Sequence, residues 1–341
     1  MSGRATERAL DKFFADGARA AATADHDALW AALTDAADGG KRVRPTLLIT
    51  VYGALGGTNG RLVSEVAAGL ELLHTAFLVH DDVIDADTVR RGRPTVSGAF
   101  AGRAHAEGVP AARAARFGDA AGILAGDLAL AGAVRTIALC GAEPATVRRL
   151  LDLVDRALHL TAAGELSDVR LSLAAPRDVA ETLVMEEHKT AVYSFELPLQ
   201  LAAVLAGAED EQVEALGRFG RLLGLAYQLR DDVDGLFGDV ALTGKDAASD
   251  LREGKCTPLM AYARTTEAWP EIAPHVGATA TDEATVARVR ALLVECGARR
   301  YVEDLAADLS RAAREAVAGL PIAPVLDTWV DTVVPHARSA A

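Results

Sequence analysis

The sequence predicts an all-α protein, and three observations support this fold class. Hydrophobic residues make up 50% of the 341 positions but aromatic residues only 5%, so the core is built mainly from Ala, Leu and Val, a composition that favours helices. Apolar residues recur at three- and four-residue spacing along most of the chain, which is the period of one helix face. No strand-like alternation competes with this pattern. We therefore expect a single multi-helix bundle over residues 1–341.

Five segments have the clearest helical period, and glycine or proline breakers separate most of them. The segments are residues 62–84, 118–138, 145–173, 180–206 and 211–236. The breakers lie at 39–40, 56–57, 92–94, 175–176, 238–254 and 321–324, as expected of helix connections in a bundle. Residues 98–116, rich in Ala and Arg, are expected to form a solvated loop or a short helix.

Charge and cysteine usage exclude several functional classes. The net charge of −13 argues against a nucleic-acid partner, because such proteins present a basic face to phosphates. The three cysteines are far apart and odd in number, which indicates a reducing compartment and no structural zinc. The longest apolar stretches, such as 197–208, fall short of the about 20 residues that span a bilayer. We expect a soluble, cytoplasmic protein without a membrane span.

The strongest local feature is a group of carboxylates at the end of an apolar helix. At about 100° per residue, Asp81 and Asp85 lie on one face, with His74 and Phe77 before them on that face and Asp82 beside them. Crowded carboxylates repel one another, and a Mg²⁺ ion would relieve the repulsion while bridging to substrate phosphates. Taken alone, such a pattern is more often a solvated acidic helix end followed by a basic loop.

A second apolar helix also ends in paired carboxylates, and this repetition favours a site. Asp231 and Asp232 close the run, and Gln228 precedes Asp231 by about one turn. Two such helices facing each other could hold a metal cluster beside a cavity walled by residues 73–79 and 222–229. The predicted site suits a molecule with an anionic head and an apolar tail.

Basic residues follow or precede these acidic motifs in several places. Each alone is more often a surface charge, but together they indicate binding of phosphate groups. Those singled out are Lys41, Arg44, Arg90, Arg91, Lys189, Lys245 and Lys255.

The ordered motifs resemble those of the trans-polyprenyl diphosphate synthases, which include farnesyl and geranylgeranyl diphosphate synthases. The resemblance covers residues 39–338 and is closest to actinobacterial geranylgeranyl diphosphate synthases. Its motifs are GGKRVRP, ELLHTAFLVHDDVID with RRGRP, GDAAGILAGDLAL, GELSDV, HKTA, and YQLRDD followed by GKD, SDLREGK and TP. It implies the isoprenoid synthase type I fold, a helical bundle around a central cavity, and a homodimer.

The resemblance also implies a reaction and a role for each motif residue. An allylic diphosphate (dimethylallyl, geranyl or farnesyl) would ionise with the help of Mg²⁺, and isopentenyl diphosphate would attack the cation. The isopentenyl diphosphate would be held by Lys41, Arg44, His74 and Arg91. Three Mg²⁺ ions would be bound by Asp81, Asp85 and Asp231, with Asp82 and Asp232 assisting. The allylic diphosphate would be bound by Arg90, Lys189, Lys245 and Lys255, and the cation stabilised by Thr190 and Gln228.

Three positions depart from the family pattern. Gly235 stands where the second acidic motif usually has its third carboxylate. Ser97 follows Val96 where the family often has a histidine, and Glu165 replaces the usual glutamine after Gly164. These departures fit a subfamily more easily than a loss of activity.

Product length is predicted from two side chains that precede the first aspartate. In the family the side chains four and five residues before it form the floor of the tail cavity, here Phe77 and Ala76. We expect geranylgeranyl diphosphate as the product, with farnesyl diphosphate as the alternative.

Two other functional classes are the rivals, a class I terpene cyclase and a non-catalytic synthase subunit. A cyclase would not need the GGKRVRP motif. A non-catalytic subunit would have lost metal-binding or substrate-binding residues.

Overall fold

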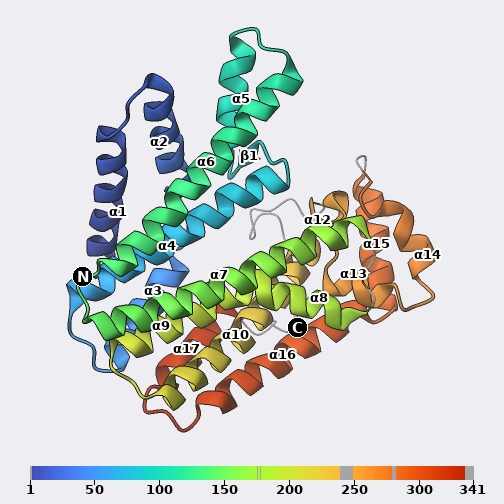
Figure 1. The fold of residues 1–341 in the computed structure, drawn as a ribbon. Helices are drawn as coiled ribbons and strands as arrows, with labels where there is room; N and C mark the ends of the chain where they lie inside the picture. Colours follow the sequence, from blue (N-terminus) through green and yellow to red (C-terminus); the bar gives the residue numbers. More distant parts are fainter. Residues whose placement is uncertain (1, 175, 177, 239–248, 279–281, 335–341) are drawn as a thin grey trace. The chain divides into compact units, whose positions relative to one another are not determined.

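The computed structural model describes residues 2–174, 176, 178–238, 249–278 and 282–334 (Figure 1). The chain divides into two compact units. The first comprises Met1–Asp152 with Val204–Ala206, and the second Leu153–Ala203 with Gly207–Ala341. Among the described residues the only strands are two short ones, so the predicted all-α class is confirmed. The single domain stays a prediction.

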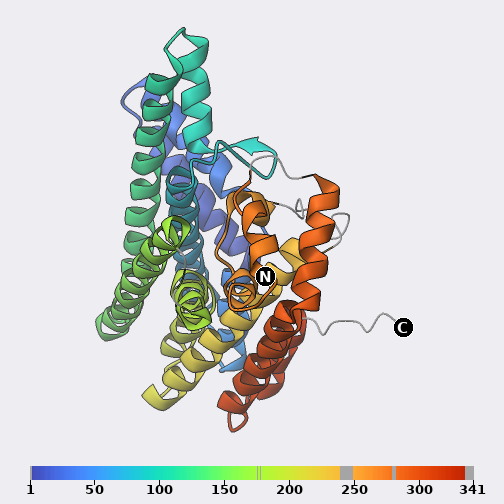
Figure 2. The same cartoon turned by 90° about the vertical axis from the view of Figure 1, so that its right-hand side faces the viewer.

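Unit 1 is built around one long apolar helix, α4 (Gly60–Ile84). Figures 1 and 2 show α6 beside it, and α1 and α3 also pack against α4. Asn59 starts α4 by accepting a hydrogen bond from the Leu62 N–H at 3.1 Å. The other elements are α1 (Ser2–Arg19), α2 (Ala24–Ala37), α3 (Val43–Ala54), β1 (Val89–Arg90), β2 (Arg93–Pro94), α5 (Val96–Ala106), α6 (Ala111–Ala138) and the start of α7 (Pro144–Leu173).

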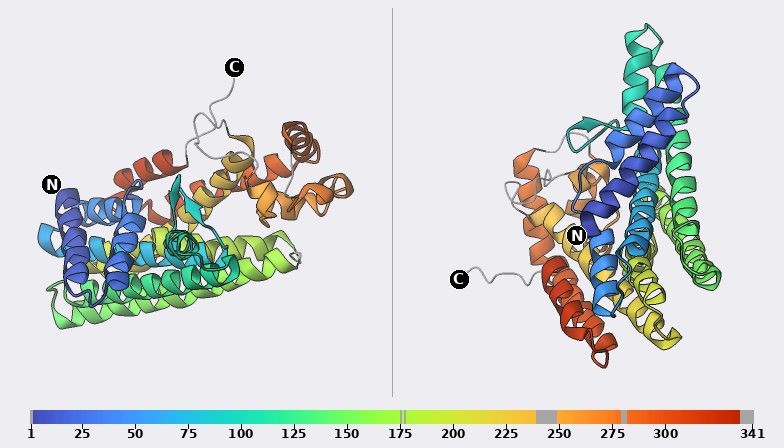
Figure 3. Two further views of the ribbon diagram at one scale, coloured as in Figure 1. Left: turned by 90° about the horizontal axis from the view of Figure 1, so that it is seen from above. Right: turned by 90° about the vertical axis from the view of Figure 1, so that its left-hand side faces the viewer.

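Unit 2 is built around α10 (Asp210–Phe237), which packs against the π-helix η1 (Glu187–Glu196) and α16 (Ala298–Val317). Its core joins α10 to the C-terminal helices through buried side chains such as Leu229, Val233 and Leu293. Figure 3 shows these helices from two further sides. The other elements are α8 (Val179–Glu186), α9 (Leu197–Leu205), α12 (Ser249–Glu253), α13 (Pro258–Ala263), α14 (Trp269–Ile272), the 3₁₀ helix η2 (Ala273–His275), α15 (Glu283–Glu295) and α17 (Ala323–Val333).

Two segments differ from the sequence-based expectation. Residues 98–116 are helical except for a short connection, since they belong to α5 and the start of α6. The predicted helix 180–206 is interrupted by the ten-residue π-helix η1, which contains Lys189 and Thr190. π-helical turns widen the backbone and occur often at functional sites. Apolar periodicity does not distinguish such a widened turn from an α-helix.

Among the described residues, two helices, α4 and α6, are long and apolar enough to cross a membrane, whereas the sequence analysis expected no stretch of that length. The apolar stretch of α4 is 72% buried and that of α6 is 44% buried. Core helices of soluble proteins satisfy the same criteria when they are buried by their neighbours. The absence of a membrane span therefore stays a prediction.

Glycines allow the helices of unit 2 to approach η1 closely. A Cβ atom on Gly164 of α7 would lie 2.3 Å from the backbone nitrogen of Lys189. A Cβ atom on Gly224 of α10 would lie 2.6 Å from the Ala191 Cβ. Both distances are too short for real atoms, so a side chain at either position would push the backbones apart.

Gly164→Ala is expected to lower the free energy of unfolding by about 1–3 kcal/mol, because the new methyl group overlaps the η1 backbone. Chemical denaturation measures this loss. Gly102→Ala in α5 is the matched control, since nothing lies within 4 Å of its Cβ position. There alanine should stabilise the helix by about 0.5–1 kcal/mol. Equal effects at the two sites would contradict the close approach.

Candidate active site

The carboxyl end of α4 carries the first group of predicted metal ligands. Asp85 is the C-cap residue, and its backbone N–H donates to the Asp81 carbonyl at 2.8 Å. Asp82 is buried, Asp81 is partly buried and Asp85 is exposed. Carboxylate oxygens are the ligands that Mg²⁺ prefers in proteins, so this donor set fits the predicted ion.

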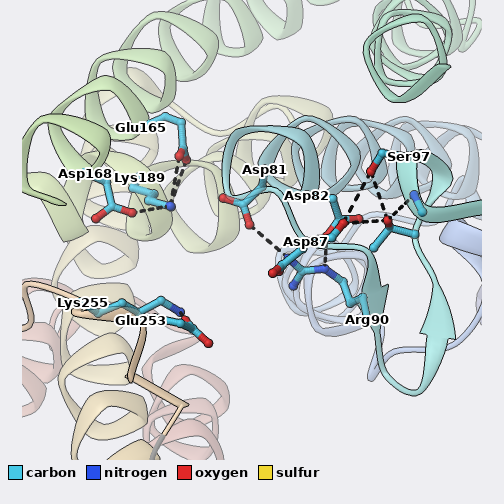
Figure 4. A network of polar contacts seen from close by, with 12 residues as sticks. Asp81, Asp82, Asp87, Arg90, Ser97, Glu165, Asp168, Lys189, Glu253 and Lys255 are labelled. Atoms are coloured by element: carbon cyan, nitrogen blue, oxygen red, sulfur yellow. Dashed lines mark hydrogen bonds and ion pairs between the residues drawn. The ribbon is translucent and has the colours of Figure 1, made fainter. Parts of the chain in front are cut away.

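Arg90 on β1 pairs with the carboxylates of this motif (Figure 4). Its Nε donates to Asp82 Oδ1 at 2.5 Å. Its Nη2 donates to Asp81 Oδ2 at 3.3 Å and to Asp87 Oδ2 at 3.4 Å. Arg90, which is predicted to bind the allylic diphosphate, therefore contacts the first acidic motif directly. A diphosphate that drew Arg90 away would leave these oxygens available to a metal ion.

The loop between α4 and α5 is held by two hydroxyl groups. Thr95 Oγ1 donates to the Asp87 carbonyl at 2.8 Å, and the Thr95 and Ser97 hydroxyls are 3.1 Å apart. Thr95 also caps α5 by accepting from the Gly98 N–H at 3.0 Å. Ser97, which departs from the family pattern, is thus part of the network that fixes the position of Asp87 and of the neighbouring Arg90.

Burial changes the acidity of one of these carboxyl groups. The pKa of Asp82 is raised from 3.8 to about 6, first because burial disfavours the charged form. The Arg90 guanidinium opposes this shift, while the charges of Asp81 and Asp87 add to it. The charged form of Asp82 is therefore favoured by the Arg90 guanidinium, which offsets part of the effect of burial.

Several arginines act on His74, the histidine predicted to bind isopentenyl diphosphate. Its pKa is well below the usual 6.5, first because of burial and then because of nearby positive charge. The contributing guanidinium groups belong to Arg44, Arg91, Arg42 and Arg90. A neutral imidazole among several guanidinium groups is a favourable place for an anion such as diphosphate. The structure thus brings His74, Arg44 and Arg91 into one electrostatic environment.

Arg42, which the sequence analysis did not single out, anchors the loop that carries Lys41 and the first turn of α3, which carries Arg44. Arg42 has φ of 48° and lies immediately before α3. Its Nη1 donates to Glu71 Oε2 at 2.6 Å, and its Nε donates to Glu7 Oε1 at 3.0 Å. Lys41 is exposed on the same loop, and Arg44 is partly buried. Arg42 therefore joins the basic loop to α4 and α1.

The two side chains predicted to set product length occupy the last turns of α4. Ala76 is fully buried, and Phe77, one turn before Asp81, is partly buried. Phe77 is the larger of the two and the more accessible. It is therefore the side chain of this pair that an apolar molecule lying along α4 would meet.

In unit 2, α10 carries the second acidic motif. Asp231 is partly buried and Asp232 is buried. Gln228 Nε2 donates to Asp232 Oδ1 at 3.0 Å, so the amide predicted to face the cation here orients a carboxylate. Glu186 at the end of α8, which the sequence analysis missed, lies beside Asp232. Burial and then the Asp232 charge raise the pKa of Glu186 well above its usual value.

The predicted diphosphate-binding lysines of unit 2 lie beside carboxylates (Figure 4). Lys189 Nζ lies 2.6 Å from Asp168 Oδ2 and 3.1 Å from Glu165 Oε1, both on α7. Lys255 Nζ lies 3.0 Å from Glu253 Oε2 in a pair that is half exposed. Thr190 follows Lys189 on η1 and is partly buried. Lys245 lies outside the described residues.

Among the residues that the structure describes, no three His, Cys, Asp or Glu side chains already stand in a metal-binding arrangement. Asp81 and Asp82 of the first motif instead share Arg90 with Asp87. Gly235, at the third position of the second motif, is buried in α10 and adds no oxygen ligand. Of the predicted ligands, Asp81 and Asp85 on unit 1 and Asp231 on unit 2 have side chains that reach solvent.

Comparison with known proteins identifies the family. The profile described as Polyprenyl synthetase matches residues 26–293. The chain belongs to the polyprenyl synthetase family. The resemblance drawn from the motifs is thereby confirmed, and the chain is a trans-prenyltransferase.

Individual relatives agree with this assignment. A geranylgeranyl diphosphate synthase from Methanosarcina mazei is 34% identical, and the match covers 79% of this chain and 76% of that protein. A geranylfarnesyl diphosphate synthase from Aeropyrum pernix is 32% identical, covering 83% and 84%. A geranylgeranyl pyrophosphate synthase structure from Corynebacterium glutamicum, complexed with isoprenyl diphosphate and magnesium, has a TM-score of 0.89 at 29% identity and covers 98% of both chains.

Asp82 should make the free energy of unfolding decrease as the pH rises between about 4 and 6 in buffer with EDTA. The unfolded chain releases this proton near 3.8 and the folded chain near 6, so the folded state binds more protons in this interval. The Asp82 contribution to the free energy of unfolding is fully present below about pH 3.8 and is lost above about pH 6. Urea unfolding of wild type and Asp82→Asn across this range measures the effect. The same slope in both proteins would contradict it.

Proposed function

We propose that this prenyltransferase makes geranylgeranyl diphosphate from isopentenyl diphosphate and allylic diphosphates, with Mg²⁺ as its cofactor. The observation that carries the proposal is the pairing of Asp81 and Asp82 with Arg90, in the same unit as the arginines around His74. Carboxylates for a divalent cation and guanidinium groups for diphosphate are the two requirements of the reaction. The relatives named as geranylgeranyl diphosphate synthases support the same chemistry.

The proposed reaction begins with cleavage of the allylic carbon–oxygen bond. The diphosphate leaves with the electron pair, and Mg²⁺, when bound, supplies positive charge for the departing anion. Arg90, Lys189, Lys245 and Lys255 would bind the allylic diphosphate. Asp81, Asp85 and Asp231, assisted by Asp82 and Asp232, would hold three Mg²⁺ ions.

The second half of the reaction forms the new carbon–carbon bond. Lys41, Arg44, His74 and Arg91 orient isopentenyl diphosphate so that its double bond attacks the allylic cation. Thr190 and Gln228 stabilise this cation with their oxygen atoms. A proton then leaves the condensed carbocation and passes to the departed diphosphate, which regenerates an allylic double bond. Exclusion of water protects the cation from being quenched.

The twenty-carbon product is proposed because of Phe77 and Ala76. Phe77 lies one turn before Asp81, so its ring would limit how far an apolar tail extends from the metal-binding end of α4. Fully buried Ala76 leaves more room than a second aromatic residue would. The geranylfarnesyl diphosphate synthase among the relatives indicates that other lengths occur within the family. Farnesyl diphosphate is the alternative product.

We also propose a homodimer in the cytoplasm. Large apolar side chains on α6 are exposed, among them Phe117, Ile123 and Leu124. A surface of this kind is typical of a protein–protein interface, and a second copy of the chain is the partner that the family resemblance implies. The three free thiols, Cys140, Cys256 and Cys296, suit a reducing compartment.

The purified protein should consume isopentenyl diphosphate with dimethylallyl diphosphate when Mg²⁺ is present and should stop when EDTA is added. Asp81→Ala should lower the rate by about 100-fold or more, because it removes a proposed ligand at the leaving group. Asp11→Ala, an exposed position on α1, is the control and should retain the wild-type rate. No consumption with any allylic primer would support a non-catalytic subunit or a cyclase instead.

Phe77→Ala should shift the products toward longer chains, because removal of the ring opens space along α4. Phe77→Leu keeps much of the volume and should shift them less. Chromatography of the dephosphorylated products measures the distribution. An unchanged distribution in Phe77→Ala would mean that another side chain limits product length.

A further inference from the structure

Glu165 shares Lys189 with Asp168 on the same helix (Figure 4). Both carboxylate oxygens of Glu165 lie 3.1 Å from Lys189 Nζ, and Asp168 Oδ2 lies 2.6 Å from it. The side chains of Glu165, Asp168 and Lys189 are 21%, 29% and 23% exposed. The ammonium group is therefore held by two carboxylates in a place that water still reaches.

The backbone fixes this arrangement. Glu165 and Asp168 are three residues apart on α7, so their side chains project from one face of the helix. The adjacent Gly164 lets α7 approach the η1 backbone at Lys189, since a Cβ atom there would lie 2.3 Å from the Lys189 nitrogen. The Lys189 backbone cannot move away from α7 without a movement of η1, so rotation of the Lys189 side chain is what lengthens its contact with Glu165.

The charges of this triad do not balance. Two carboxylates and one ammonium leave a net charge of −1 at the group proposed to bind an anionic diphosphate. An incoming diphosphate must compete with both carboxylates for the N–H donors of Lys189. Glutamine at position 165, the residue usual in the family pattern, would keep a hydrogen-bond acceptor and remove the competing charge. The negative charge of Glu165 therefore opposes diphosphate binding, and a glutamine at this position would lack that charge.

We propose that Glu165 weakens the binding of the allylic diphosphate by holding Lys189, and so sets the affinity of this enzyme for its allylic substrate. This inference rests on the proposed function of Lys189. Asp168 makes the shorter contact, so the longer, two-oxygen contact of Glu165 is the one that yields when Lys189 turns to a diphosphate. The released Glu165 carboxylate then repels the diphosphate, which also favours departure of the product.

Steady-state kinetics of Glu165→Gln test the proposal. The KM for the allylic diphosphate should fall by about threefold to tenfold, because a partly exposed competing charge is removed. The KM for isopentenyl diphosphate should stay unchanged, since Glu165 has no place in the site proposed for it. Glu165→Asp, which keeps the charge, should restore an allylic KM close to that of wild type.

The control variant is Glu181→Gln, which removes the same charge from another ion pair of unit 2. Glu181 Oε1 lies 2.5 Å from Arg170 Nη2, and neither residue belongs to the proposed binding set. Its allylic KM should equal that of wild type. A fall as large as that in Glu165→Gln would mean that the effect comes from overall charge, and would overturn the inference.

Calorimetric binding of inorganic diphosphate in the presence of Mg²⁺ gives a readout that needs no turnover. Glu165→Gln should bind it about threefold to tenfold more tightly than wild type. Equal affinities would overturn the role of Glu165, even if the wild type turns over isopentenyl diphosphate normally. Wild type that binds diphosphate but forms no product would contradict the proposed function instead, and the two failures are thereby distinguishable.

Discussion

The structure depends on pairing charges that are partly removed from water. Arg90 pairs with Asp81, Asp82 and Asp87 at the end of α4. Ion pairs of the same kind join Arg42 to Glu7 and Glu71. They also join Lys189 to Glu165 and Asp168. A buried charge without a partner is strongly destabilising, so partly buried cationic groups such as Arg90 and Lys189 need an anion nearby. Under the proposed function, a diphosphate and its metal ions exchange with these protein partners.

Close packing of backbones puts these charges in place. Gly164 brings α7 against η1, and Gly224 brings α10 against the same π-helix. In unit 1 the short ribbon of β1 and β2 carries Arg90 back to the end of α4. Most of the proposed site residues therefore come from helix ends, a widened helix and a tight ribbon. The regular parts of α4 and α10 supply the buried apolar surface that holds each unit together.

Periodicity and motif order predicted much of the fold and part of the candidate site. The helices around residues 62–84 and 211–236 were predicted because apolar spacing reports which side chains are buried. The π-helix η1 was not, since apolar periodicity does not distinguish a π-helical turn from an α-helix. Glu186 and Arg42 were missed because periodicity does not report contacts between distant segments of the chain. Their partners Asp232 and Glu71 lie 46 and 29 residues away in the sequence, and only the folded chain brings them into contact.

We propose that carboxylates neutralise the cationic groups until Mg²⁺ and diphosphate replace them together. Calorimetric titration of the wild-type protein with inorganic diphosphate, in EDTA and then with Mg²⁺, tests this exchange. We expect binding at least about tenfold tighter with Mg²⁺, because the metal would occupy the carboxylates that otherwise hold Arg90. Equal affinity under the two conditions would contradict it.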